Sequence, residues 1–438
     1  MSKNPVQLCL PFMHGLPNET PMASTEDILT QYSYPPSIIA DILSTSKTTI
    51  HKGIANKKFV ADAHGNISLA QLVPMSDAIK RSREYIRREV APLRRYTVAE
   101  FFAGAGGMAL GLERAGLTSV LINEIDKKAC ETLRHNRPKW NVIEKDISEM
   151  DFSSEIASDL EVDVVAGGFP CQPFSYAGKS LGFQDTRGTL FYEFARAIKA
   201  LSPKVFIAEN VKGLMNHDSG RTMETICSIL EELGYNIACK DVFKAILYRV
   251  PQKRERLFII GTRKDLSMEY EPPIPCPQIY TLQDALCAGE LFSSDVPISE
   301  GQSYPEKKKK VMEMVPEGGF WKDLPLEIQK EYMKKSFFLG GGKTGMARRL
   351  SMREPSLTLT CAPAQKQTER CHPKETRPLQ IREYARIQTF PDQWVFKGSL
   401  TSQYKQIGNA VPVHLAYAIG QSVVQFLNQV EPRQQSLF

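Results

Sequence analysis

The run Tyr96–Phe102 (YTVAEFF), followed by Ala103–Gly111 (AGAGGMALG), decides the fold of this chain. The first run is apolar and strand-like, and the second is a glycine-rich turn that leads into a helical pattern. A strand, a glycine turn and a helix in this order open a Rossmann-like sheet at its cofactor site. A second strand, predicted for Ser119–Asn123, ends at Glu124, where a carboxylate can hold ribose hydroxyls. The pattern predicts an α/β fold with an adenosine-containing cofactor, and both S-adenosylmethionine and NAD satisfy it.

The same βα rhythm continues to about residue 262 and then stops. Apolar runs bounded by turn residues predict further strands at Asn141–Glu144, Val162–Ala166, Lys204–Ala208, Tyr235–Val242 and Leu257–Gly261. Amphipathic patterns predict helices at Thr189–Leu201 and Arg221–Leu233. A last apolar helix, ending near Leu427, is expected to return to this sheet. The strand at 141–144 ends near Asp146 and Ile147, which could hold an adenine ring, although turn chemistry also explains the Asp.

Three chemically active residue types follow the ends of the predicted strands. Cys171 lies on the turn GGFPCQPFS (Gly167–Ser175), where a thiol is either a nucleophile or a buried structural cysteine. Glu209 leaves the next strand at the same edge of the sheet. Arg254 and Arg256 alternate along an extended segment, so one of them can order the carboxylate or bind an anion.

The composition is that of a soluble globular protein of two or three domains, with 438 residues, 24% charged and 42% hydrophobic. We expect no membrane span, because no run of eighteen apolar residues occurs. Nine scattered cysteines without CxxC spacing predict reduced thiols in the cytoplasm, with no disulfide and no metal site. The segment Ser303–Gln380 has 16 Lys and Arg against 9 Asp and Glu, a balance of +7 that suits a polyanion such as nucleic acid.

Residues 1–95 differ in texture from the sheet that follows. Two short helical patterns, Ser37–Leu43 and Lys47–Ile54, are separated by Ser44–Ser46 and resemble a helix-turn-helix, with Phe59–Leu69 as a wing. The alternative is a packing appendage. A basic amphipathic helix is predicted for Ala78–Val90.

Taken together, these blocks resemble the DNA (cytosine-5) methyltransferases, particularly those of bacterial restriction–modification systems. The resemblance covers Tyr96–Phe426 and rests on ordered blocks at 102–107, 123–124, 168–172, 209–211, 252–256, 382–391 and 406–409. It implies a Rossmann-like S-adenosylmethionine-dependent sheet at 96–262 plus 404–430, with a smaller, irregular target-recognition domain at 263–403. The N-terminal extension, residues 1–95, lies outside the resemblance.

The resemblance implies that Cys171 adds to C6 of a flipped cytosine in double-stranded DNA, while Glu209 contacts N3 and the exocyclic amine. Arg256 would lie against the base and help to orient Glu209, with Arg254 as the closer support. The implied cofactor residues are Phe102, Gly104, Gly106, Glu124, Ile125, Asp146, Ile147, Pro170 and Asn409. The residues expected to contact DNA are Gln172, Ser175, Arg348, Arg349, Gln365 and Lys366.

Further expectations concern partners. We expect a monomer that protects DNA alongside a separately encoded cognate restriction endonuclease. The tail Gln434–Phe438 resembles a sliding-clamp-binding peptide. Two alternative functions stay open at this point: a transfer-RNA cytosine-5 methyltransferase, and a DNA-binding regulator that acts through the N-terminal segment.

Overall fold

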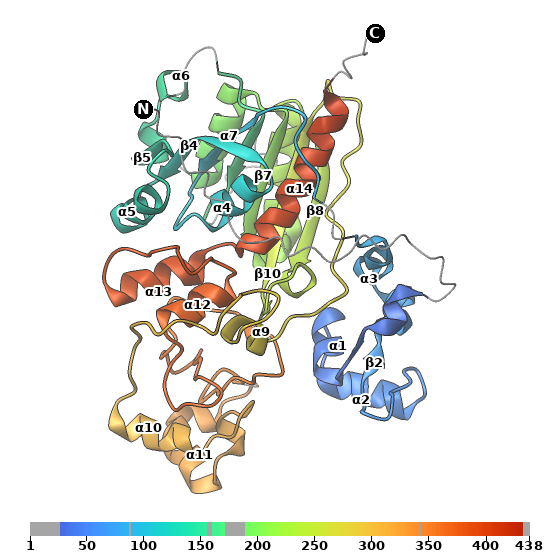
Figure 1. The fold of residues 1–438 in the computed structure, drawn as a ribbon, viewed down its shortest axis with the longest axis vertical. Coiled ribbons are helices and arrows are strands. Elements are labelled where there is room, and N and C mark those ends of the chain that lie inside the picture. Colours follow the sequence, from blue (N-terminus) through green and yellow to red (C-terminus); the bar gives the residue numbers. More distant parts are fainter. Residues whose placement is uncertain (1–26, 87–88, 156–159, 171–188, 342, 432–438) are drawn as a thin grey trace, which may run out of the picture.

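The computed structural model describes residues 27–86, 89–155, 160–170, 189–341 and 343–431. Its centre is a seven-stranded sheet in the order β5-β4-β3-β6-β7-β10-β8, in which β10 runs antiparallel to both neighbours (Figure 1). The strands are β3 (Tyr96–Phe101), β4 (Leu117–Glu124), β5 (Val142–Glu144), β6 (Val164–Gly167), β7 (Val205–Val211), β8 (Tyr235–Lys244) and β10 (Glu255–Arg263). The predicted α/β class and all seven predicted strands are confirmed.

Helices cover both faces of this sheet, because its central strands are apolar on both sides. Every residue of β3 and β6 is buried, as expected for parallel strands between two helical layers. Alternate residues belong to different clusters: Val98 packs with α4 and α14, whereas Ala99 packs with α7 and α8. The helices around the sheet are α4 (Gly107–Arg114), α5 (Lys127–Asn136), α6 (Phe152–Glu155), α7 (Leu190–Leu201), α8 (Arg221–Glu232) and α14 (Val413–Val430), with short 3-10 turns at Ile147–Glu149, Lys212–Gly220 and Ala245–Leu247.

The last helix, α14, returns to the sheet, as predicted, and packs against α4. A Cβ atom on Gly111 of α4 would lie 2.4 Å from Cβ of Ala416, so α4 and α14 approach closely only because Gly111 has no side chain. The segment Leu400–Val430 contains a window long and apolar enough to cross a membrane, but 72% of that window is buried inside the protein. Its composition is that of a core helix.

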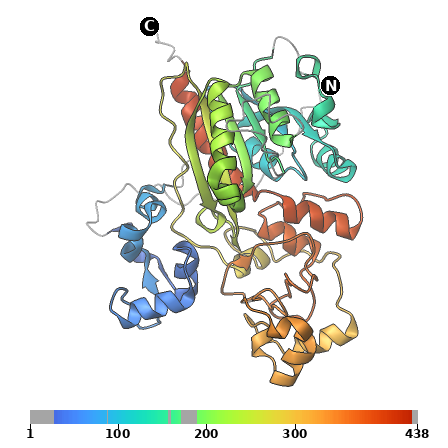
Figure 2. The same ribbon diagram turned by 180° about the vertical axis from the view of Figure 1, so that it is seen from behind.

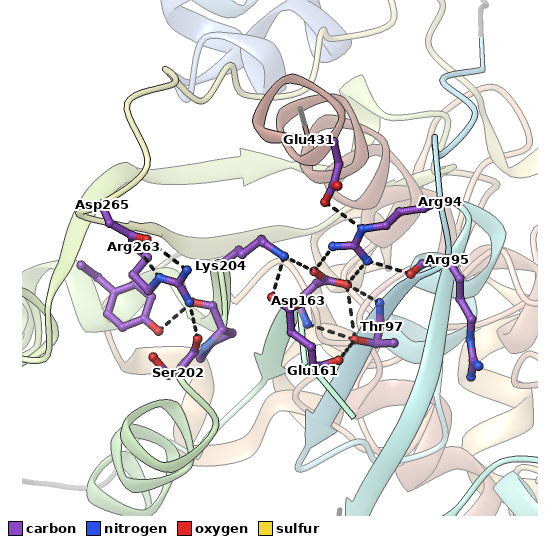
Figure 3. Close-up of polar contacts among 12 residues, drawn as sticks. Arg94, Arg95, Thr97, Glu161, Asp163, Ser202, Lys204, Arg263, Asp265 and Glu431 are labelled. Atoms are coloured by element: carbon purple, nitrogen blue, oxygen red, sulfur yellow. Dashed lines mark hydrogen bonds and ion pairs between the residues drawn. The ribbon is translucent and has the colours of Figure 1, made fainter. Parts of the chain in front are cut away.

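A buried ion network joins the strand starts at the edge opposite the glycine turn (Figure 3). Asp163, before β6, accepts from Arg94 Nη2 at 2.6 Å, from Lys204 Nζ at 2.8 Å and from the Thr97 amide at 3.0 Å. Arg94 also contacts Glu431 at 2.7 Å, at the end of α14. Burial opposes ionisation of Asp163, but the hydrogen bonds from Arg94 and Lys204 outweigh it and hold its pKa below the usual range. The network therefore ties β3, β6, β7 and α14 together.

The N-terminal residues form a small module beside the sheet, shown in blue in Figures 1 and 2. The predicted pair of helices is present, with Ser44 in the left-handed region and Ser46 accepting from the Thr49 amide at 3.0 Å as the N-cap of α2. The module consists of β1 (Ser33–Tyr34), α1 (Pro36–Ile42), α2 (Lys47–Ala55), β2 (Ile67–Ser68), α3 (Asp77–Arg81) and 3-10 turns at Ile28–Gln31, Leu69–Met75 and Ser82–Glu84.

The two other N-terminal predictions were a wing at Phe59–Leu69 and a helix at Ala78–Val90. The wing is a tight turn in which Asp62 accepts from the amides of His64 and Asn66, and β2 pairs with β1. The helix predicted for Ala78–Val90 is wrong at Tyr85, Ile86, Glu89 and Val90, because α3 tightens into a 3-10 turn that ends at Glu84. The side chains that suggested a longer helix, such as Ile86, lie outside it.

Residues 263–403, which we call the recognition region after their expected role, have more helix than we predicted. The run Lys307–Lys310 lies in a helix that buries only Met312, so four consecutive lysines hide its apolar period. Proline precedes this helix and the next one, at Pro305 and Pro325. The elements are α9 (Leu282–Leu286), α10 (Glu306–Glu313), α11 (Leu326–Met333), α12 (Ile381–Ile387), α13 (Leu400–Asn409), 3-10 turns at Trp321–Asp323 and Lys334–Phe338, and β11 (Ser356–Leu357), which pairs with β9 (Gln252–Lys253).

Candidate active site

Glu209 and Arg256 lie on adjacent strands at the carboxyl edge of the parallel sheet. Glu209 of β7 pairs with Phe258 of β10, and Arg256 lies two residues before Phe258, so both side chains project from one face. Arg256 Nε lies 2.9 Å from Glu209 Oε1, and the two side chains are 15% and 13% exposed. The pair is therefore shielded, yet open on one side.

Burial sets the protonation of this pair. It raises the pKa of the Glu209 carboxyl above its usual range, and the charges of Arg256 and Arg254 oppose that rise only in part. Burial likewise lowers the pKa of Arg256, which the charge of Glu209 opposes. A carboxyl with a raised pKa can hold a proton at neutral pH and donate it in a hydrogen bond.

The loop after β6 is held against this carboxylate. A Cβ atom on Gly168 would lie 2.8 Å from Glu209 Oε2, so a side chain at this position would displace the Glu209 carboxyl group. Asn210 Nδ2 donates to the Phe169 carbonyl at 2.9 Å and fixes the start of the loop to β7. Asn210 gave no functional signal in the sequence beyond standing next to Glu209. Pro170 is exposed and is the last residue of the described segment 160–170. Cys171, Gln172 and Ser175 lie outside the described residues.

The prediction that Arg254 is the closer support of Glu209 is wrong, because Arg256 makes the ion pair with Glu209, whereas Arg254 acts on Glu209 through its charge. Its side chain is almost fully buried, and its guanidinium donates to the Leu359 carbonyl at 3.3 Å and the Gly408 carbonyl at 3.0 Å. Burial lowers the pKa of Arg254 to about 9, and Arg256 adds to that effect. Arg256 is the direct partner of Glu209, and Arg254 joins the recognition region and α13 to the sheet.

Two buried glutamines extend this junction and were not predicted. Gln252 Nε2 donates to Gln388 Oε1 at 2.9 Å, and Gln388 donates in turn to the Ile407 and Ala410 carbonyls. Both residues lie in the sequence blocks quoted above, but their spacing gave no sign that they meet.

The glycine turn has the geometry of a cofactor loop. Gly104 and Gly106 have φ of 56° and 84°, in the region that favours glycine, and Phe102 has φ of 58°. Glu124 accepts from the Gly104 amide at 2.7 Å and from the Ile125 and Asp126 amides at 2.9 and 2.7 Å. The carboxylate thus stands at the tip of β4 with a fixed orientation, as ribose binding requires.

The remaining predicted cofactor residues occupy different environments. Ile125 is 65% exposed, whereas Ile147 is 3% exposed and belongs to the core below the sheet edge. Asp146 caps a short turn by accepting from Ser148, and those hydrogen bonds lower its pKa. Asn409 is exposed at the end of α13, where its Oδ1 accepts from the Cys361 thiol at 3.1 Å. The positions of Ile125, Asp146 and Asn409 leave them accessible to a ligand.

Arg349 was predicted to contact DNA, and the structure contradicts this. Its side chain is buried and donates to backbone carbonyls of Val315 at 2.7 Å and Met312 at 2.6 Å, and to Thr376 Oγ1 at 2.9 Å. A guanidinium engaged in this way holds the recognition region together and cannot reach a base.

The other predicted DNA contacts that the structure describes, Arg348, Gln365 and Lys366, are at least partly exposed. The Arg348 guanidinium lies 5.8 Å from the Phe320 ring centre, and burial lowers its pKa. Gln365 and Lys366 are exposed on a loop, where Lys366 Nζ donates to the Tyr332 carbonyl at 2.6 Å.

A Rossmann-like sheet, a glycine turn with a ribose-type carboxylate and a carboxyl–guanidinium pair at the same edge define an enzyme of the class that binds an adenosine-containing cofactor. Residues 96–425 match the family model of the C-5 cytosine-specific DNA methylases, and the chain belongs to that family. It is therefore a DNA (cytosine-5) methyltransferase with S-adenosyl-L-methionine as the methyl donor.

Comparison with known proteins supports this assignment. The chain is 58% identical to the type II methyltransferase M.Eco47II of Escherichia coli, over 91% of this chain and 96% of that protein. It is 59% identical to M.PspPI of Psychrobacter sp. strain TA137, over 90% and 96%. A crystal structure described as a prophage-encoded DNA modification methyltransferase of E. coli covers 76% of this chain and 99% of its own, with 26% identity and a TM-score of 0.55. These relatives place the chain among restriction–modification methyltransferases and favour DNA over the transfer-RNA and regulator alternatives.

Proposed function

We propose that methyl transfer proceeds through a covalent bond between the Cys171 sulfur and C6 of a cytosine flipped out of the duplex. The thiolate adds to C6, the displaced electron pair makes C5 nucleophilic, and C5 takes the methyl group. A base then removes the proton from C5, and the thiolate leaves as the aromatic ring is restored.

Glu209 is the group that makes this addition favourable. Protonated, it donates to N3 and offsets the negative charge that enters the ring, while Arg256 fixes its orientation. The observation that carries this proposal is the shielded Glu209–Arg256 pair, against which Asn210 and Gly168 fix the loop that leads to Cys171.

The cofactor residues fit the methyl donor. S-adenosyl-L-methionine supplies an electrophilic methyl group on a sulfonium. Glu124 would hold the ribose hydroxyls, and Gly104 and Gly106 would let the backbone approach. Ile125 would give an apolar contact, with Asp146 and Ile147 at the adenine. Phe102, Pro170 and Asn409 would complete the pocket.

The DNA-contacting role is assigned to Arg348, Gln365 and Lys366 of the recognition region, with Gln172 and Ser175 next to the flipped base. We further propose a cytoplasmic monomer that protects the sites of a separately encoded endonuclease. The tail Gln434–Phe438, which lies outside the described residues, would bind a sliding clamp.

The test is expression in cells that lack cytosine methylation, followed by conversion sequencing, with Cys171→Ser alongside. We expect one short motif to be methylated by the wild type and none by the variant. Full methylation by Cys171→Ser would refute the nucleophile. A genome left unmethylated by soluble wild-type protein that binds the cofactor would refute the activity itself.

A further inference from the structure

The module formed by residues 27–84 is fixed to the catalytic domain. Lys244 Nζ donates to the carbonyls of Asp41, at 2.9 Å, and Ile42, the last residues of α1. Residues of α1 share an apolar cluster with the catalytic domain, for example Ile39 with Phe243. Such contacts leave little freedom for the module to act as a tethered appendage.

A second bridge includes the recognition region. Lys253 Nζ lies 2.8 Å from Asp41 Oδ2 of α1 and 2.9 Å from Glu354 Oε2. One lysine therefore connects the N-terminal module, the strand next to Arg254 and the segment leading into β11.

The turn between α1 and α2 contacts the sheet at the edge that carries the Glu209–Arg256 pair. Ser44 Oγ donates to Glu255 Oε1 at 3.4 Å, and Lys212 Nζ lies 2.9 Å from Glu255 Oε2. Glu255 precedes Arg256, the partner of Glu209. Helix α2 begins three residues after Ser44.

The outer face of α2 is basic and polar. Its inner face buries Ile50 and Gly53, so Thr48, His51 and Lys52 face solvent, and Lys47 is exposed as well. The segment 44–60 contains four lysines, at 47, 52, 57 and 58, and no Asp or Glu. None of these lysines pairs with a carboxylate in the part of the chain that the structure describes. Unneutralised lysines on a helix with short neighbouring side chains suit a phosphate backbone.

Figures 1 and 2 show α1 and α2 on one side of the molecule and α10 and α11 on the other, both beyond the end of β10 that carries Arg256. A duplex is a rod, so DNA with its target base at Glu209 continues outward beyond this edge of the sheet.

We propose that α2 and the residues through Lys58 bind the phosphate backbone of the same duplex whose cytosine occupies the catalytic site, on one flank of the target. The inference rests on the proposed position of the flipped base at Glu209. It makes the N-terminal module a third DNA-binding element, beside the catalytic domain and the recognition region. The alignment with M.Eco47II covers 91% of this chain, which is more than the family-matched residues 96–425 and the thirteen residues after them. The alignment therefore extends into the N-terminal module, as expected if relatives share this module.

The experiment compares duplexes that carry the methylated motif with flanks of about 5 or about 15 base pairs, about half a helical turn or about one and a half. The variant is Lys47→Gln with Lys52→Gln. The control, Lys199→Gln with Lys264→Gln, removes the same charge from exposed positions at the opposite edge of the sheet. Binding is measured against salt concentration, and methylation by single turnover at saturating DNA.

On the long duplex, we expect the variant to lower the slope of log K against log salt by about 1 to 2, since each phosphate contact contributes about 0.9. The short duplex, the control variant and the saturated methylation rate should not change. Lengthening only one of the two flanks should be enough to produce the difference in slope between variant and wild type. A separate non-specific duplex, added to the short duplex, should not produce it.

Equal slopes for variant and wild type on the long duplex would overturn the inference, as would full compensation by the separate duplex. Both results leave methylation intact. A wild type that binds both duplexes but methylates neither would instead refute the proposed function, so the two failures are distinguishable.

Discussion

Arg256 Nε lies 2.9 Å from Glu209 Oε1 across two antiparallel strands, and neither side chain is more than 15% exposed. The guanidinium lowers the pKa of a carboxyl that burial raises. The pair therefore couples the orientation of Glu209 to its protonation, and the two can be separated by substitution.

Glu209→Gln should lower the single-turnover rate by about 100- to 1000-fold, because the amide cannot transfer the proton that the adduct requires. In the wild type, the rate should fall as pH rises through the raised pKa of Glu209. Arg256→Gln removes the charge that lowers this pKa, so the alkaline limb should move to higher pH while the plateau rate drops. The measurement is a pH–rate profile of the wild type and of both variants. An alkaline limb that lies at the same pH in Arg256→Gln and in the wild type would contradict the assigned protonation of Glu209.

Arg254→Gln should act on stability. Its guanidinium donates to carbonyls of Leu359 and Gly408 inside the protein, and the shorter amide leaves these acceptors unpaired. We expect a loss of about 2 to 5 kcal/mol in the free energy of unfolding. Arg256→Gln, two residues away, is the matched control and should lose rate with a much smaller loss of stability. Urea denaturation decides between these outcomes, and equal losses would show that the two arginines are not distinct.

Arg349→Gln and Arg348→Gln form a second matched pair. Arg349 donates to buried carbonyls, so its substitution should cost about 3 kcal/mol or more of stability. Arg348→Gln should change stability by less than about 1 kcal/mol and weaken DNA binding. If Arg348→Gln binds its duplex as tightly as the wild type, the assignment of Arg348 to DNA contact is wrong.

Glu100→Gln tests a buried acid beneath the glycine turn. Burial raises the pKa of Glu100 to about 8, so the folded state keeps a proton that the unfolded chain loses near pH 4.5. Stability from this group is therefore present below about pH 4.5 and is lost as pH rises through about 8. Between pH 5 and pH 8, the free energy of unfolding should fall less for Glu100→Gln than for the wild type. Glu149→Gln, at an exposed position, should keep the wild-type loss; a similar loss in all three proteins would refute the buried proton.

The strands and the sheet edge could be predicted because their signals are local. The apolar run before Glu209 and the glycines after Phe102 each determine their own backbone, and parallel strands bring their ends to one edge. The packing of Gly168 against Glu209 was not predictable, because it depends on how two strands are spaced.

The roles of the arginines could not be read from the sequence. Arg254 and Arg256 occupy equivalent positions in the alternating sequence pattern, yet Arg254 donates to carbonyls that lie more than a hundred residues away in the chain. Arg348 and Arg349 are adjacent, and only the fold of the recognition region makes Arg349 face inward. Helix α10 was missed because a surface helix with one buried residue carries almost no apolar period.

Arg94 and Glu431 meet at 2.7 Å, just before the first strand of the sheet and just after its last helix. The chain therefore enters and leaves the catalytic domain at one corner. A short peptide could join these two points, and the domain could then be opened at a surface loop elsewhere, because the order of the covalent chain is not what holds the sheet together. This geometry makes the domain suited to circular permutation, and segments that precede Arg94 or follow Glu431 join the domain at the same corner.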